Sequence, residues 1–126
     1  MKFCDMPYQR PDLEQVKARL SDQTARLKGA ASYDEAKAVF LEREREQKHL
    51  HTAQTLAHIR HSIDTRDAFY DGEVKFWNAA EPELQPYQQD WTRVMLDFPF
   101  RQDFAREYGD LMFVNAEIQL KTFAPP

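Results

Sequence analysis

Apolar residues recur every three or four positions along most of the chain, and this spacing predicts helices rather than strands. The first such stretch begins near Asp12, which has the spacing of a capping box with Gln15. It ends at Gly29, in the place after a helix where glycine is common. One face of this predicted helix carries four apolar residues, namely Leu13, Val16, Leu20 and Leu27.

A longer helical stretch follows a second capping box, formed by Ser32 and Glu35. No glycine or proline interrupts the chain from there to Asp71, which permits one long helix, or a pair of nearly collinear helices, over roughly residues 32–64. We expect a break or bend near Asp64 and Thr65, because both residue types favour caps over helix interiors.

The middle of this long stretch has no apolar residue from Glu42 to His49. Glutamates and arginines spaced three and four residues apart stabilise a helix locally there, but they bury no apolar surface. We therefore expect the middle part to project into solvent or to face a partner.

Further helices are predicted in the C-terminal half. A helix with Phe69 and Trp77 on its apolar face is ended or kinked by Pro82, and the next stretch is amphipathic as far as Phe98. A short helix then reaches Gly109. Twelve of the sixteen aromatic residues lie from Phe69 onward, so we expect a core centred on this half and wrapped by the first helices.

The last predicted helix runs from Asp110 to about Phe123 and is apolar on two faces. A helix of this kind requires burial on two sides. We therefore expect the isolated chain to self-associate or to be only marginally stable. The two faces consist of Leu111, Val114 and Ile118, and of Phe113, Leu120 and Phe123.

These elements place the chain in the all-α class, as a single domain over residues 1–126 that forms a bundle of about five to six helices. The net charge of −4 lacks the basic excess of a nucleic-acid-binding protein. No stretch reaches the roughly 20 apolar residues of a membrane span, and the N-terminus lacks the apolar core of a signal peptide. Cys4 is the only cysteine, so no intrachain disulfide can form. We expect a cytoplasmic protein.

A charged run from Arg60 to Asp71 combines two arginines, one histidine and three aspartates with apolar residues at helical spacing. It has a structural interpretation, a network of ion pairs at a helix junction in which Arg60 and Asp64 are i,i+4 partners. It also has a functional interpretation, a surface that lines a substrate channel. The candidate residues are Arg60, His61, Asp64, Arg66, Asp67 and Tyr70.

The histidines give little support to a metal site. Glu46 and His49 have the spacing used in di-iron bundles, but such a site needs a second motif of the same kind on another helix. A site built from His58 and His61 lacks a third ligand, and closed zinc sites use four. We therefore expect no metal and no catalytic residue in this chain. All four histidines fall on the one long predicted helix: His49, His51, His58 and His61.

Nearly the whole chain resembles the N-terminal helical region of the oligoendopeptidase F family, the thimet-like zinc metallopeptidases. The charged run from Ile59 to Asp71 is the most recognisable part. Shorter matches lie elsewhere: Met1-Lys2-Phe3, Pro7-Tyr8, Arg10-Pro11-Asp12, Pro99-Phe100-Arg101, Ala116-Glu117 and Gln119-Leu120-Lys121-Thr122-Phe123.

The resemblance implies the leading segment of a larger enzyme, in which such helices form one wall of a deep peptide-binding channel. These peptidases bind zinc on an HExxH helix, with the glutamate as general base. No histidine here is followed by glutamate, so the motif is absent. The implied zinc, the remaining peptidase chain and the short peptide substrates therefore all belong to the parent enzyme.

Two other functions remain open from the sequence. The chain could be a stand-alone helical module that binds a protein partner through its apolar faces and has no enzymatic activity. A small helical metal-binding protein has weaker support, for the reasons given for the histidines.

Overall fold

The computed structural model describes residues 7–123 and, for Phe123, the backbone alone. Five helices follow one another: α1 (Leu13–Lys28), α2 (Tyr33–Ile63), α3 (Ala68–Asp97), α4 (Arg101–Tyr108) and α5 (Leu111–Phe123). The described residues contain no strand, so the predicted all-α class is confirmed. The expectations for the first residues, including Cys4, and for the final three residues fall outside the described range.

The predicted caps form at the first two helices. The side chain of Asp12 accepts hydrogen bonds from the backbone N–H groups of Glu14 and Gln15, and Ser32 Oγ accepts one from Glu35. Gly29 ends α1 with φ −91°, so it does not adopt the left-handed conformation typical of a glycine after a helix.

Helix α2 is continuous over 31 residues, which decides between one helix and two. Helix α3 is also continuous, although Pro82 and Pro86 lie inside it. Of the two alternatives predicted at Pro82, an end of the helix is therefore wrong. A proline removes one backbone hydrogen bond, but Trp77 and Leu84 are buried on either side of it, and this packing stabilises the helix across Pro82.

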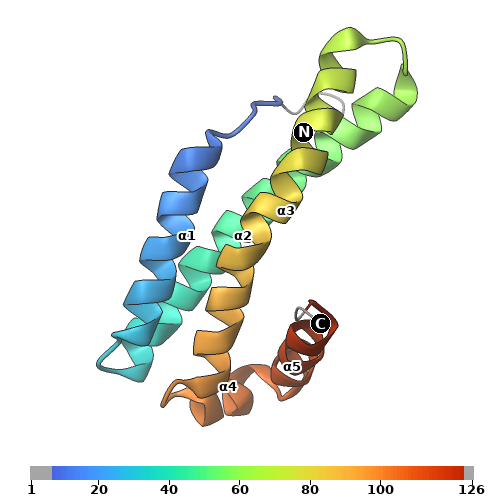
Figure 1. The fold of residues 1–126 in the computed structure, drawn as a ribbon. Helices are drawn as coiled ribbons and strands as arrows, with labels where there is room; N and C mark the ends of the chain where they lie inside the picture. The colour runs from blue at the N-terminus through green and yellow to red at the C-terminus, as the bar shows by residue number, and fades with distance from the viewer. Residues whose placement is uncertain (1–6, 124–126) are drawn as a thin grey trace.

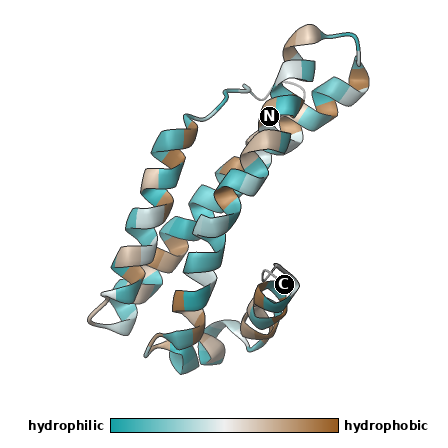
Figure 2. Ribbon diagram, in the orientation of Figure 1, coloured by the Kyte–Doolittle hydropathy of each residue, from teal (hydrophilic) through white to brown (hydrophobic). Residues whose placement is uncertain are grey.

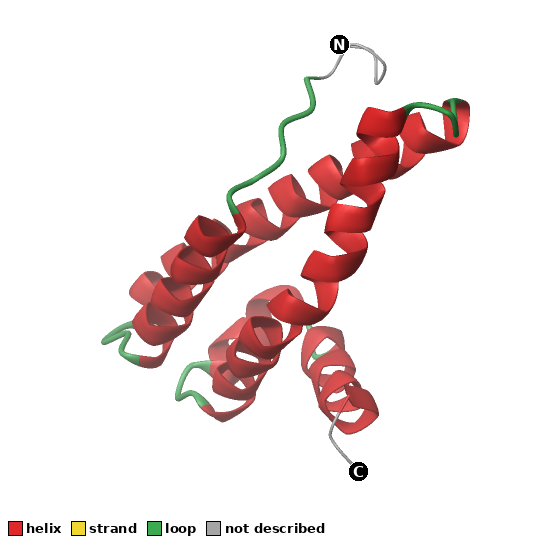
Figure 3. Ribbon diagram, turned by 45° about the horizontal axis from the view of Figure 1, so that its top comes forward, coloured by secondary structure: helices red, strands yellow, loops and turns green. Residues whose placement is uncertain are grey.

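Helices α2 and α3 form a long antiparallel hairpin, and α1 packs against both (Figure 1). The chain turns at α4, and α5 then packs against α3. Hydrophilic and hydrophobic residues are interleaved along each helix (Figure 2). Figure 3 shows the same helices from a second direction, joined by short loops.

The buried apolar residues form two clusters rather than the single C-terminal core that we predicted. Residues from α1, α2 and α3 contribute to both clusters, so the first helices are part of the core and do not wrap it. One cluster lies near α4 and α5 and contains Leu27, Ala36, Val39, Trp91, Met95, Phe98, Phe104 and Phe113. The other contains Val16, Leu20, Leu50, Ala53, Ala57, Trp77 and Leu84.

Arg43 is fully buried between these clusters and has 0% exposed surface. Its guanidinium donates to Leu20 O at 3.1 Å and Gln23 Oε1 at 3.3 Å on α1. It also donates to Tyr87 O at 3.4 Å and Gln88 Oε1 at 3.3 Å on α3. The expectation that the middle of α2 faces solvent is therefore wrong at this residue.

The aromatic face of Trp91 completes the surroundings of Arg43, with the guanidinium carbon 4.6 Å from the ring centroid. Burial lowers the pKa of Arg43 to about 10, which leaves the side chain charged at neutral pH. Position 43 follows Val39 by four residues and precedes Leu50 by seven. It therefore continues the apolar stripe of α2, and this was the available signal that it points inward.

Helix α5 is buried on one face only. Phe113 is 1% exposed, whereas Leu111, Val114 and Ile118 are 70%, 48% and 55% exposed. The predicted two-faced apolar character is therefore present in the described side chains, and these three residues form an uncovered stripe. We call it the α5 stripe.

Replacing Arg43 with alanine is expected to destabilise the fold by about 3 kcal/mol or more, because it removes a buried side chain together with its hydrogen bonds to two helices. Urea unfolding followed by circular dichroism measures this. Arg45→Ala is the control, since Arg45 is an exposed residue of the same helix and such substitutions usually change stability by less than about 0.5 kcal/mol. Equal stability of the two variants would show that Arg43 is not a structural centre.

The chain alone is expected to self-associate through the α5 stripe, because burial of exposed apolar side chains favours association. Sedimentation velocity over a range of concentrations measures this, and Ile118→Glu is expected to shift the chain toward the monomer. Ile63→Glu is the matched control, because Ile63 is also exposed, at 79%, but lies at the end of α2. A wild-type chain that stays monomeric, or an equal effect of both substitutions, contradicts the prediction.

Candidate functional site

The predicted charged run lies at the junction of α2 and α3, and we call residues 60–71 the junction segment. The structure brings part of it together. Arg60 Nη1 donates to the hydroxyl of Tyr70 at 3.0 Å, and His61 Nε2 lies 3.4 Å from Asp71 Oδ1. Both contacts join the last turns of α2 to the first turn of α3.

The two aspartates of the loop shape the backbone. Asp64 Oδ1 accepts from the backbone N–H of Arg66 at 3.0 Å and lies 3.5 Å from its Nε atom. Asp67 caps α3 by accepting from the backbone N–H groups of Phe69 and Tyr70. The Arg66 side chain is 92% exposed, so it is the most accessible charge of the junction segment. The predicted break near Asp64 is confirmed, since α2 ends at Ile63.

A buried carboxylate anchors the residues before α1 to this end of α3. Glu73 is 4% exposed. It accepts a hydrogen bond from the Tyr8 hydroxyl at 2.6 Å, and both of its oxygens accept from Arg10. Trp77 Nε1 in turn donates to the Tyr8 hydroxyl at 3.1 Å. The sequence reasoning missed this network, because it joins Tyr8 and Arg10 to residues of α3 more than 60 positions away.

The same network also contacts the aromatic residues of the junction segment. The ring of Tyr8 makes edge contacts with the rings of Phe69 and Tyr70, at centroid distances of 6.2 and 5.8 Å. Hydrogen bonds from Arg10 lower the pKa of Glu73. Burial, with the hydrogen bond to Glu73, raises the pKa of Tyr8 to about 12. Glu73 is therefore ionised and Tyr8 is neutral near pH 7.

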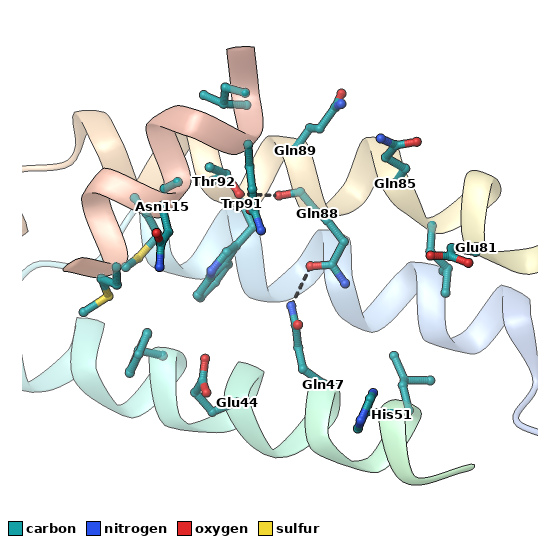
Figure 4. A pocket seen from close by; sticks show the side chains of 18 of the residues that line it. Glu44, Gln47, His51, Glu81, Gln85, Gln88, Gln89, Trp91, Thr92 and Asn115 are labelled. Atoms are coloured by element: carbon teal, nitrogen blue, oxygen red, sulfur yellow. Dashed lines mark hydrogen bonds between the residues drawn. The ribbon is translucent and has the colours of Figure 1, made fainter. Parts of the chain in front are cut away.

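A groove of about 850 Å³ lies between α2, α3 and α5. Glu44, Gln47 and His51 enter it from α2, a row from Glu81 to Thr92 enters from α3, and Asn115 enters from α5 (Figure 4). None of the six predicted site residues lines it. The sequence reasoning missed the groove because its polar residues are spread over three helices and form no motif.

Carboxamide side chains dominate the polar lining of this groove. Gln47 Nε2 donates to Gln88 Oε1 at 2.5 Å, which links α2 to α3 across the floor. Both tryptophans of the chain, Trp77 and Trp91, also line the groove and connect it to the core. The seven carboxamide residues are Gln47, Gln54, Gln85, Gln88, Gln89, Asn115 and Gln119.

Neither surface has the form of a metal centre. Over residues 7–123, no three histidine, cysteine, aspartate or glutamate side chains are grouped so that they could hold a metal ion. His58 Nδ1 is instead 2.9 Å from the backbone oxygen of Gln54. Within the same range, no helix combines the length and apolar character needed to cross a membrane.

Comparison with known proteins identifies the family. A family model described as the peptidase M3 N-terminal domain matches residues 3–123 of the chain. A search of curated proteins gave no match. The resemblance to oligoendopeptidase F seen in the sequence is thereby confirmed.

Solved structures agree closely with the fold. A 3.1 Å X-ray structure assigned as an oligoendopeptidase F is 34% identical, with a TM-score of 0.94 over 99% of this chain. PZ peptidase A with an inhibitor is 31% identical, and an oligoendopeptidase F assigned in Bacillus anthracis str. Ames is 32% identical, each with a TM-score of 0.93 over 98% of this chain. The chain spans only 22%, 22% and 23% of these three solved chains.

Replacing Glu73 with glutamine is expected to cost about 1–2 kcal/mol at pH 7, because it removes a charge-assisted pair with the half-exposed Arg10. Since the folded-state pKa of Glu73 is lowered, its stabilisation is present above the unfolded-state pKa and is lost as the pH falls through the folded-state value. The difference in urea midpoint between wild type and variant should therefore shrink below about pH 4.

Glu117→Gln is the control for this measurement, because Glu117 pairs with Arg101 at an exposed site. Its substitution should cost less than about 0.5 kcal/mol. A difference between wild type and Glu73→Gln that stays constant down to pH 2 would contradict the assigned role of the carboxylate.

Proposed function

The chain belongs to the family of peptidase M3 N-terminal domains, and on that premise we propose that it is the non-catalytic N-terminal part of a zinc metallopeptidase that hydrolyses short peptides. In the parent enzyme it would form part of the wall of the substrate channel. Its role there would be to select and orient peptides sterically, without breaking bonds. We propose a cytoplasmic location for the parent enzyme.

One observation carries this proposal. Almost all of the chain superposes on a minor part of much longer chains assigned as oligoendopeptidases, with a TM-score of 0.94 at 34% identity. An entire helical fold that recurs inside a longer peptidase is most simply a component of one. We propose the activity and substrates of the whole enzyme, and the presence of its remaining chain, on the basis of this structural similarity.

The zinc of the parent enzyme would be bound by other parts of that enzyme. The residues described here do not fit a zinc site, because all four histidines lie on α2 and no three potential ligands are grouped. We therefore assign no step of peptide hydrolysis to a residue of this chain.

We propose that the junction segment faces the channel. A peptide has charged ends and a polar backbone, so a wall that orients it needs fixed donors and acceptors. Arg66, His61 and Asp67 provide both kinds. Asp64 holds the backbone of Arg66, and Asp67 caps the start of α3. The exposure of Arg66 leaves its guanidinium available to a ligand.

A second function, a protein-binding module without enzymatic activity, is favoured by the α5 stripe. Its three apolar side chains are exposed on one face of a helix that is packed on the other. In a peptidase this stripe would contact the remaining chain, whereas in a module it would contact a separate protein. An open reading frame that continues to an HExxH helix favours the peptidase, and a native stop codon after residue 126 favours the module.

Substitution of Arg66 with alanine in a full-length peptidase that carries this chain tests the channel role. We expect kcat/KM for short peptides to fall by about 1–3 kcal/mol, the range for loss of a charge-assisted hydrogen bond, with unchanged zinc content. Steady-state kinetics on a quenched fluorescent peptide measure this.

Arg106→Ala is the matched control, because Arg106 is also an exposed arginine paired with a nearby aspartate, but on α4. It should leave kcat/KM unchanged. If Arg66→Ala instead lowers the melting temperature and leaves the activity of the folded fraction intact, the segment is purely structural and the channel role is refuted.

A further inference from the structure

We propose that the groove between α2, α3 and α5 binds a short, extended peptide that carries a basic side chain, holding it through the peptide backbone. This inference rests on the proposed function, since it assigns to this domain a subsite for the substrate class of the parent enzyme. It concerns a different surface from the junction segment.

The lining argues against another helix as the occupant. The polar residues of the α2 wall are Glu44, Gln47, His51 and Gln54, beside the apolar Phe40 and Leu50. They are spaced three and four residues apart, which is the spacing of a helix-packing seam. Such a seam is normally apolar. A packed helix could hydrogen-bond these groups only through side chains, because its backbone donors and acceptors are already paired.

An extended peptide offers backbone hydrogen-bond partners to the carboxamide side chains of the groove. Each carboxamide has both donors and acceptors, and so does each peptide unit of an extended chain. Within the described part of the protein, the side chains of Gln54, Gln85, Asn115 and Gln119 make no hydrogen bond to another protein group. They lie on three helices around the groove, where they can pair with a backbone from several sides.

The charge of the lining selects the kind of peptide. Glu44 and Glu81 line the groove, and its lining contains no lysine or arginine. The carboxylates come from opposite walls, α2 and α3 (Figure 4). A lysine or arginine side chain on the peptide complements them, whereas an aspartate or glutamate is repelled.

The dimensions suit a peptide of about six residues. The α2 wall runs from Phe40 to Gln54, which at about 1.5 Å per residue is a length of about 21 Å. An extended chain advances about 3.3 Å per residue. The volume of about 850 Å³ falls in the range of ligand-binding pockets.

Binding to this chain can be measured by its intrinsic fluorescence, because its two tryptophans both line the groove. The probes are alanine pentapeptides with blocked ends, whose central residue is lysine, methionine or aspartate. We expect the lysine peptide to bind about fivefold more tightly than the methionine peptide, and the aspartate peptide to bind most weakly.

Two variants separate the backbone contacts from the charge contacts. Gln54→Ala combined with Gln85→Ala should weaken all three peptides by about tenfold, because it removes backbone hydrogen bonds. Glu44→Gln combined with Glu81→Gln should remove most of the preference for lysine and leave the methionine peptide unaffected. Gln15→Ala on α1 and Asp34→Asn at the start of α2 are the controls, since neither residue lines the groove, and they should change nothing.

Three results would overturn the inference: no saturable binding, equal binding of the lysine and aspartate peptides, or equal effects of the groove and control variants.

A fourth result that would overturn the inference is that the parent enzyme's own chain permanently covers the groove. In the full-length enzyme, Gln85→Cys should add a reaction with a thiol reagent that the parent enzyme lacks when substrate is absent, and the lysine peptide should protect against it. A position 85 cysteine that never reacts shows permanent cover. None of these results depends on Arg66→Ala kinetics, so failure of the groove and failure of the channel wall are distinguishable.

Discussion

The burial of Arg43 at the level where three long helices meet is the constraint on which the fold depends. A buried charge is costly unless its donors are satisfied. Here Nη1 and Nη2 donate to neutral oxygens of α1 and α3, whereas the buried Nε has no hydrogen-bond partner among the described residues. Two of these acceptors are backbone carbonyls, so pairing of the guanidinium depends on where α1 and α3 lie relative to α2. A slip of α1 or α3 by one turn would move the carboxamide of Gln23 or Gln88 away from the guanidinium, although another backbone carbonyl would come close to the place of the first.

This polar layer also explains why the core is divided. Gln23 and Arg43 occupy inward positions that apolar residues hold elsewhere along the same helices. The apolar residues therefore gather above and below them, in one cluster beside α4 and α5 and another toward the junction segment. Since α1 covers one side of the α2–α3 hairpin and α5 covers only part of the other, the polar seam of the hairpin is left as a groove.

The periodicity of apolar residues was sufficient to predict the helices, because each buried stripe repeats with the helical period. Local rules also located the caps at Asp12 and Ser32 and the break after Ile63. They failed at Pro82 and at Arg43. In both cases contacts with distant residues outweigh a local preference: packing of α3 keeps Pro82 inside a helix, and acceptors from two other helices permit a buried arginine.

The candidate surfaces differ in how far sequence could reveal them. The junction segment is contiguous, so its charge density is visible, but the anchoring of Tyr8 and Arg10 on Glu73 joins residues more than 60 positions apart. The groove has no contiguous signature, since polar residues at helical spacing on α2 and α3 look like ordinary solvated faces. Only the packing of α5 beside α3 turns one of those faces into the wall of a groove. A domain without catalytic groups can therefore contribute to a peptidase through geometry: rigid helices held in register by Arg43 fix the separation of the polar groups that a peptide would contact.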